Sequence, residues 1–349
     1  VQTCALPISD KMENFSQFLS NFIEKNHIDS IVCFGDSRPM HQIAKQVATE
    51  KNLHFWAMEE GYFRPFCVTI EKDGCNHFSP IPRRASFFQA AFDDLKHKQY
   101  QPTQGNFNVF LGGRLIAWKY AWYRNGKRCL KYPHYHHHRD GSVAKFMRLL
   151  LLGEMRRLKY RIQDRWLMRR IIHHKIGHFY ILPLQLFDDA QISMHSDFAS
   201  VEAFLMYVLQ SFADNAPPDL KLMVKHHPLD IYFKDYTQAI NDFIRRHPHC
   251  QGRVFYIHEM PLPVLLRKGQ AMIVMNSTSG VSALLHHLPV KVLGRANYDI
   301  AGLTDQQSLE DFWHNPQKPD AALFHAFRQY HMNVTQVAGS FYSRVALPD

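Results

Sequence analysis

Two adjacent carboxylates, Glu59 and Glu60, follow an apolar run and stand shortly before a guanidinium, Arg64. A carboxylate at the end of a buried strand suits proton transfer, and a guanidinium suits an anionic ligand. A salt bridge within a loop would account for the same three residues. The spacing alone therefore leaves a functional and a structural interpretation open.

A second acidic pair, Asp188 and Asp189, lies just after another apolar run, at 179–182. If this run is the first strand of a domain, the pair lies at the lip between two domains, where a carboxylate is a candidate nucleophile or base. Capping of a helix or pairing with a cation is the alternative.

Two polar loops are candidate anion sites. The first, between a predicted strand and a predicted helix, contains backbone N–H groups, hydroxyls and the positive end of a helix dipole. A plain Ser/Thr helix cap is the alternative. This loop consists of Asn276, Ser277, Thr278, Ser279 and Gly280. The second, which has the same two interpretations and in which Arg38 favours an anion, consists of Gly35, Asp36, Ser37 and Arg38.

The stretch VKHHPLD (224–230) places Lys225, His226 and His227 at a predicted strand end. Pro228 holds the preceding residue extended, so that one imidazole points across the edge of the sheet, where it could donate to a phosphate. Metal binding is a weaker interpretation, because no acid or cysteine stands at ligand spacing. We expect no metal site, and we expect the HYHHH run at 134–138 to be a solvated loop.

Alternating strands and helices would position these residues. An amphipathic helix is predicted near 10–25, and strands at 31–34 and 53–58 flank a second helix. Short connections between them indicate a parallel α/β sheet, in which ligands bind beyond the carboxyl ends of the strands. A second such domain is predicted from strands at 179–182, 222–225, 254–257, 273–275 and 290–293, with helices near 199–212, 262–268 and 281–286. Two facing domains of this kind indicate a GT-B-like arrangement of Rossmann-like domains.

The chain has 349 residues, of which 46% are apolar, and this is enough for two domains. We expect a Rossmann-like domain at 9–112, incomplete at its start, and a nucleotide-binding Rossmann-like domain at 179–349. Between them, 113–178 is predicted to be a basic helical insert. We expect residues 1–8, VQTCALPI, to be a scar encoded by a sequencing adapter, so that the chain is a fragment beginning inside its gene.

The net charge of +10 is concentrated between Arg114 and Lys175, where 17 lysines and arginines accompany three acids. Long aliphatic runs such as 149–152 interrupt the charges, which favours a membrane surface over nucleic acid. No run of 18 apolar residues is present, and the six cysteines form no CxxC pair, as is typical of a reducing compartment.

Taken together, these stretches resemble the capsule polysaccharide synthesis family, in particular its KpsS/LipB branch. The matching stretches are FGDSRP (34–39), EEGYFRP (59–65) with Thr69 and Glu71, PLQ, DDAQI and HS within 183–196, VKHHPLD, NSTSG with Ala283 and Leu284, PVKVLG, YD and GLT within 289–304, and Phe341 with Tyr342.

The resemblance implies a retaining β-Kdo glycosyltransferase without a cofactor or an obligatory metal. Members use CMP-β-Kdo to begin the poly-Kdo linker on (lyso)phosphatidylglycerol in capsular polysaccharide biosynthesis and export in Gram-negative bacteria. By motif, Asp189 would be the nucleophile, Glu60 an acid/base candidate, and His227 with the 276–280 loop would hold the CMP phosphate. Our own additions are Arg64 and Lys225 as ligands of the Kdo carboxylate.

The expected partners are therefore CMP-Kdo, an anionic phospholipid acceptor and the inner-membrane surface, to which a cytoplasmic protein would attach peripherally. The strand and Gln-Gly-Pro-type loop with which the family normally begins are not found, so the fragment could be inactive. Two alternatives are a different GT-B-like nucleotide-sugar transferase or epimerase, and a basic nucleic-acid-binding module.

Overall fold

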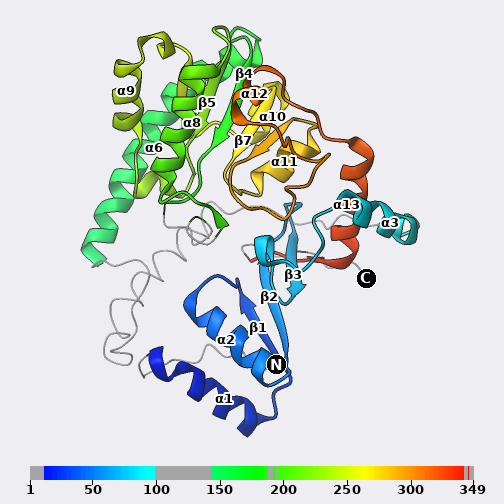
Figure 1. Cartoon of the computed structure of the whole chain (residues 1–349). Helices are drawn as coiled ribbons and strands as arrows, with labels where there is room; N and C mark the ends of the chain where they lie inside the picture. Colours follow the sequence, from blue (N-terminus) through cyan, green and yellow to red (C-terminus); the bar gives the residue numbers. More distant parts are fainter. Residues whose placement is uncertain (1–11, 99–142, 188–191, 193–194, 342–344, 346–349) are drawn as a thin grey trace. The chain divides into compact units, whose positions relative to one another are not determined.

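The computed structural model describes residues 12–98, 143–187, 192, 195–341 and 345. Its contacts divide the chain into two compact units (Figure 1), one comprising 1–80, 101–150 and 335–349 and the other 81–100 and 151–334. Each unit has its own β-sheet flanked by helices, which confirms the predicted α/β class. The expected scar at 1–8, the HYHHH run and the predicted boundary near 112 lie outside the described residues.

The sheet of the first unit has the strand order β1-β2-β3-β9. Strands β1 and β2 are parallel and are joined by α2, as the strand–loop–helix–strand pattern predicted. Strands β3 and β9 run antiparallel to their neighbours, so the sheet is mixed and not wholly parallel. The elements of this unit are η1 (Met12–Asn14), α1 (Phe15–Asn26), β1 (Ser30–Phe34), α2 (Pro39–Glu50), β2 (His54–Glu60), β3 (Cys67–Lys72), η2 (Asn76–Phe78) and β9 (Gln336–Ala338).

Helices α1 and α2 pack together and share a small core with the sheet. Phe15, Leu19 and Ile23 recur at four-residue spacing on one side of α1, and all three are buried. Helix α2 begins with Pro39 after an extended Arg38, a common way to start a helix, because the first N–H needs no partner.

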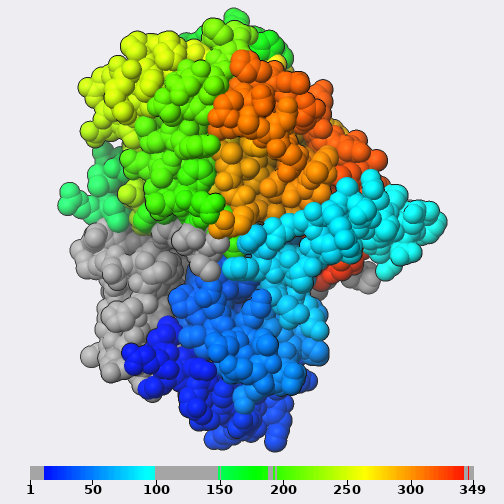
Figure 2. Space-filling view, viewed as in Figure 1, coloured from blue at the N-terminus to red at the C-terminus, as the bar shows by residue number. Residues whose placement is uncertain are grey.

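The sheet of the second unit has the order β6-β5-β4-β7-β8, and all its paired strands are parallel. Every residue of β4 and β7 is buried, as expected where helices cover both faces of a sheet. On one face, the green helix α8 and the orange segment that includes α12 form the surface (Figure 2). The strands are β4 (Phe179–Pro183), β5 (Lys221–Lys225), β6 (Val254–Ile257), β7 (Ala271–Val274) and β8 (Val290–Val292).

The helices of the second unit include the three predicted near 199–212, 262–268 and 281–286, one from the predicted basic helical insert, and several that were not predicted. One of the latter, α13, packs against α3, where the buried Phe88 contacts Phe327 and Tyr330. The helices are α3 (Ala85–Leu95), α6 (Val143–Ile172, in this unit from Leu151), α8 (Val201–Asn215), η3 (Asp230–Tyr232), α9 (Thr237–Arg246), η4 (Pro248–Cys250), α10 (Leu262–Lys268), α11 (Ser279–Leu285), α12 (Leu309–His314) and α13 (Ala321–Val334).

Neither unit is a single continuous stretch of the chain. Strand β9 returns to the first sheet, where the Gln336 side chain donates to Thr69 Oγ1 at 3.0 Å and accepts the Tyr62 N–H at 2.9 Å. Residues 81–98 belong to the second unit, because α3 packs on α13. Both differ from the ranges 9–112 and 179–349 expected from the sequence.

Candidate functional site

The strand order of the second unit creates a switch point between β4 and β7. The chain proceeds from β4 to β5 and β6 on one side and continues with β7 and β8 on the other. In open α/β sheets, the loops at such a point diverge and leave a crevice at the carboxyl ends of the strands. The loops that leave β4 and β7 carry the PLQ and NSTSG motifs.

A pair of side-chain amides joins these two loops. Gln185 donates to Asn276 Oδ1 at 2.8 Å, and Asn276 donates to the carbonyl oxygen of His195 at 3.1 Å. Both polar ends of Asn276 are thus engaged with the protein. Asn276 therefore positions the loop, although it was predicted to bind the sugar donor CMP-Kdo. The candidate nucleophile Asp189 and its neighbour Asp188 lie just beyond this loop, outside the described residues.

The rest of the NSTSG loop turns tightly into α11. Ser277 Oγ accepts the N–H of Ser279 at 3.2 Å and its hydroxyl proton at 2.9 Å. A Cβ on Gly280 would lie 2.4 Å from the hydroxyl oxygen of the fully buried Tyr298, which itself donates to the Ser277 carbonyl. This close approach explains the glycine. Because α11 has only seven residues, its dipole is small, and the anion-binding interpretation rests on N–H groups and hydroxyls of 277–280.

The HHP sequence sends its two imidazoles in different directions. The ring of His227 is half-buried, and its Nδ1 accepts the N–H of Leu229 at 3.3 Å. An atom that accepts this bond carries no proton, so the neutral ring has its proton on Nε2. His227 can therefore donate through Nε2, as the predicted phosphate contact requires. His226 is buried, with 2% exposure.

The last residue of the same motif, Asp230, joins it to the loop after β4. Its side chain is fully buried, and Oδ2 accepts the N–H of Phe187 at 3.1 Å. The N–H of Asp230 in turn donates to the carbonyl oxygen of His227 at 2.9 Å. Asp230 thus fixes His227 beside the chain segment that leads to Asp188. This aspartate ends the VKHHPLD stretch, but no role was predicted for it.

Lys225 is placed differently from the prediction. Its ammonium is buried, with 8% of the residue exposed, and donates to the carbonyl oxygens of His258 at 2.9 Å and of His226 at 3.4 Å. Burial lowers the pKa of Lys225 to about 8, although the carboxylates of Asp164 and Glu259 oppose the shift. These contacts join the ends of β5 and β6, and they favour a positioning role over contact with a sugar carboxylate.

A cluster of aromatic rings surrounds His226, the first histidine of the HHP sequence. The rings of His226 and His258 are 4.9 Å apart, and Tyr160 of α6 stacks on His258 with a centroid distance of 3.5 Å. The Tyr256 hydroxyl lies 2.6 Å from His226 Nδ1. Burial lowers the pKa of His226 to about 4 and that of His258 to about 3, so both rings are neutral at physiological pH.

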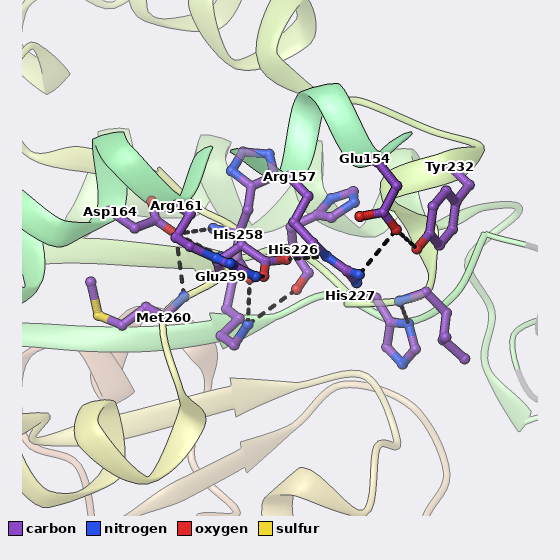
Figure 3. A network of polar contacts seen from close by, with 12 residues as sticks. Glu154, Arg157, Arg161, Asp164, His226, His227, Tyr232, His258, Glu259 and Met260 are labelled. Carbon is purple, nitrogen blue, oxygen red and sulfur yellow. Dashed lines mark hydrogen bonds and ion pairs between the residues drawn. The ribbon is translucent and has the colours of Figure 1, made fainter. Parts of the chain in front are cut away.

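Helix α6 holds the loops at the ends of β5 and β6. Asp164 Oδ2 accepts the N–H groups of His258 at 2.8 Å, Glu259 at 2.6 Å and Met260 at 3.2 Å. Burial raises the pKa of Asp164, and these three bonds act against that shift. Farther along the helix, the Tyr232 hydroxyl donates to Glu154 at 2.9 Å (Figure 3). None of these contacts was predicted, because they join residues that are far apart in sequence.

Ion pairs strengthen the same attachment. Arg157 binds Glu259 at 3.2 Å and Glu154 at 3.4 Å, and its side chain is only 14% exposed. Arg161 reaches Glu259 at 3.6 Å. Part of the basic character of the predicted insert therefore serves to attach α6 to its own unit.

In the first unit, the GDSR loop is held mainly by its aspartate. Gly35 adopts a left-handed φ of +87°, and its N–H donates to the Met58 carbonyl at 2.8 Å. Asp36 is 2% exposed and accepts the Ser37 hydroxyl at 3.0 Å and the Cys75 N–H at 2.8 Å. These contacts give Asp36 and Ser37 a structural role, whereas Arg38 is exposed at the start of α2.

The EEGY motif begins inside the strand β2, not beyond it as expected. Glu59 pairs with Thr69 of β3, and Glu60 pairs with Val68. Successive side chains of a strand point to opposite faces of the sheet, so the two carboxylates lie in different environments. The Oε1 atom of Glu59 lies under the GDSR loop, 3.3 Å from where a Cβ on Gly35 would be.

Glu60 forms an ion pair with Arg64, and the two side chains are 25% and 54% exposed. The motif's tyrosine is buried, and its hydroxyl donates to Glu71 at 2.8 Å and accepts the Asn76 N–H at 2.9 Å. Burial raises the pKa of Glu71. The salt bridge that was the alternative interpretation of these residues therefore exists, and more than half of the Arg64 side chain is exposed.

The part of the chain that the structure describes has neither a metal-binding group of side chains nor a membrane-spanning helix. It contains no group of three or more His, Cys, Asp or Glu side chains that could hold a metal ion. None of its helices is long and apolar enough to cross a membrane.

Comparison with known proteins agrees with the motifs. The capsule polysaccharide modification protein LipB of Neisseria meningitidis serogroup B is 47% identical over 351 residues, covering 100% of this chain and 83% of that protein. The capsule polysaccharide export protein KpsS of Escherichia coli is 34% identical over 331 residues, covering 95% and 83%.

Among solved structures, the β-Kdo 2,7 transferase KpsC of Thermosulfurimonas dismutans covers 89% of both chains at 14% identity with a TM-score of 0.43. That similarity is too low to assign an activity, and the GT-B-like placement of the two domains stays a prediction. A family model for capsule polysaccharide biosynthesis proteins matches residues 29–342. With this match and the two relatives above, the chain belongs to the capsule polysaccharide biosynthesis protein family.

Proposed function

We propose that this protein is a retaining glycosyltransferase that transfers Kdo from CMP-β-Kdo to a phosphatidylglycerol-type lipid and so begins a capsular poly-Kdo linker. The observation that carries the proposal is the meeting of three family motifs at the β4/β7 switch point. Gln185 bonds Asn276, and Asp230 bonds the Phe187 N–H, so that the loops after β4, β5 and β7 are held together.

In this proposal the second unit binds the CMP part of the donor. His227 donates from Nε2 to the phosphate, and the N–H groups and hydroxyls of 277–280 bind its other oxygens. Lys225 and Asn276 act indirectly, because both are engaged in holding these loops. In the first unit, Arg64 offers its exposed guanidinium to the Kdo carboxylate.

The chemistry proceeds by two displacements. The Asp189 carboxylate forms a bond to the anomeric carbon of Kdo as the bond from that carbon to the phosphate oxygen breaks, and CMP leaves with the electron pair. An acceptor hydroxyl then attacks the same carbon, transfers its proton to the Glu60 carboxylate and releases Asp189. Two inversions at one carbon give net retention.

The test is incubation of the full chain with CMP-Kdo and lyso-phosphatidylglycerol, followed by mass spectrometry of the lipid. The expected product is the lipid with one added Kdo, accompanied by one equivalent of CMP. Release of nucleotide from UDP-sugars and not from CMP-Kdo would overturn the donor assignment and favour another nucleotide-sugar enzyme.

A further inference from the structure

Helix α6 has large apolar side chains on two opposite sides. One side, which includes Tyr160, Leu167 and Ile171, is buried against the second unit. The other side, here called the outer stripe, is open to solvent. It consists of Leu151, Met155, Leu158, Ile162 and Trp166, which are 66%, 71%, 61%, 62% and 59% exposed.

The spacing of the outer stripe places it along one line of the helix. Its members follow one another at intervals of four, three, four and four residues, so they share one side of a 3.6-residue helix. The stripe is about 22 Å long at 1.5 Å per residue. Isolated exposed apolar residues are common, but a row of five large ones on one helix indicates a contact surface.

Basic side chains border the stripe on both sides. Lys159, Arg161, Arg165 and Arg169 are exposed, and at 100° per residue they fall beside the apolar line or within it. The two acids of this segment are used elsewhere: Glu154 accepts the Tyr232 hydroxyl, and Asp164 accepts three backbone N–H groups. The outward surface of α6 is thus apolar along its middle and mainly cationic at its borders, where Arg161 also pairs with Glu259 at 3.6 Å and Glu154 is 41% exposed.

We propose that the outer stripe of α6 is the surface through which the second unit lies on an anionic phospholipid bilayer. A helix with this pattern lies in the plane of the interface, with its apolar side chains among the acyl chains and its cations among the headgroup phosphates. A second copy of this helix fits less well, since two-fold pairing would bring arginines together without acids to match them. Nucleic acid would leave the five apolar side chains without a partner.

This surface would also bring the proposed active site to its lipid acceptor, and that part of the inference rests on the proposed function. The inner side of α6 holds the loops around His227: Glu154 bonds Tyr232 of η3, and Asp164 bonds the loop after β6 (Figure 3). A bilayer-bound α6 would therefore hold the HHP end of the sheet at a fixed distance from the lipid headgroups, where a lipid acceptor is found.

The test is co-sedimentation of the full chain with vesicles of phosphatidylglycerol and phosphatidylcholine. The wild type should bind these vesicles more tightly than pure phosphatidylcholine, and added salt should weaken the binding. The double variant Leu158→Gln with Ile162→Gln should bind about tenfold more weakly or worse. A matched control, Tyr207→Gln with Val334→Gln, changes two other exposed apolar residues of this unit (49% and 52% exposed) and should bind like the wild type.

Trp166 provides a second measurement. Vesicles should shift the tryptophan emission of the wild type to shorter wavelength, and the shift should shrink in Trp166→Phe. Wild-type vesicle binding by the Leu158→Gln/Ile162→Gln variant would overturn the inference. So would a solution dimer that this variant dissociates, or salt-sensitive binding to duplex DNA without vesicle binding. Kdo transfer to detergent-dispersed lipid is measured separately: its failure with intact vesicle binding would overturn only the proposed transferase.

Discussion

The buried histidine pair should make the second unit sensitive to acid. In the folded protein the pKa of His226 is about 4 and that of His258 about 3, against 6.5 for an ordinary histidine. At pH values between the folded and the unfolded pKa, the unfolded chain binds more protons than the folded chain. The contribution of the two neutral rings to the free energy of unfolding is therefore fully present above about pH 6.5 and is lost as the pH falls. At about pH 5, roughly 1.5 units below the ordinary value, each ring costs about 2 kcal/mol.

His258→Phe isolates half of this effect. Neither ring nitrogen of His258 has a hydrogen-bond partner among the described residues, and the ring stacks face to face on Tyr160. A phenyl ring fills similar space without burying unpaired polar atoms. The variant should therefore be at least as stable as the wild type at about pH 7.5 and about 2 kcal/mol more stable at about pH 5.

The measurement is urea denaturation at both pH values, followed by far-ultraviolet circular dichroism. The same substitution at His286, an exposed histidine of the same unit, is the control and should keep the wild-type loss of stability between the two pH values. If His258→Phe also kept that full loss, the explanation by buried neutral imidazoles would be wrong.

The remaining predictions concern the proposed site. His227→Ala should weaken CMP-Kdo binding by about 1–3 kcal/mol with an unchanged melting temperature, measured by calorimetry and thermal melting; unfolding would instead mean a structural histidine. Asp189→Asn should fold normally and lose roughly 10³-fold or more in turnover, and wild type given CMP-Kdo without acceptor should show a Kdo-sized mass on the peptide containing Asp189. An adduct on Glu60 would instead make Glu60 the nucleophile and Asp189 the acid/base candidate. Gly280→Ala should force the Tyr298 ring away and destabilise the protein by about 1–3 kcal/mol in denaturant titration, whereas an unchanged midpoint would show that the loop relaxes freely.

Local patterns in the sequence were sufficient for most of the sheet structure. The runs that became β1, β2, β4, β5 and β6 are apolar, short and bounded by turn residues, and α1 shows its buried side by spacing alone. The three-residue strand β9 carries no comparable signal, because its place depends on hydrogen bonds to β3 across the whole chain. Helix α6 was predicted as basic and helical, but apolar residues on two sides do not reveal which side is buried.

The candidate site was predicted less completely. The motifs identified the loops after β4, β5 and β7, but not which of their side chains bind the protein itself. Nothing local distinguishes His226 from His227, and only the fold shows that the first is buried and the second half-exposed. The same holds for Lys225 and Asp164, whose partners come from other elements. The motifs thus predicted where the candidate site lies, and the tertiary hydrogen bonds show which of its side chains bind the protein itself.

The return of β9 to the first sheet has a consequence for the order in which the protein can assemble. Gln336 is separated from its partner Thr69 by 267 positions, so during synthesis the first sheet must wait for its last strand until the second unit has been made. Until then β3 is an open edge with unpaired N–H and C=O groups, a template for unwanted pairing between nascent chains. Ribosomal stalling or proteolysis shortly before residue 336 would release a protein whose second unit is nearly complete and whose first unit is prone to aggregate through the open edge of β3.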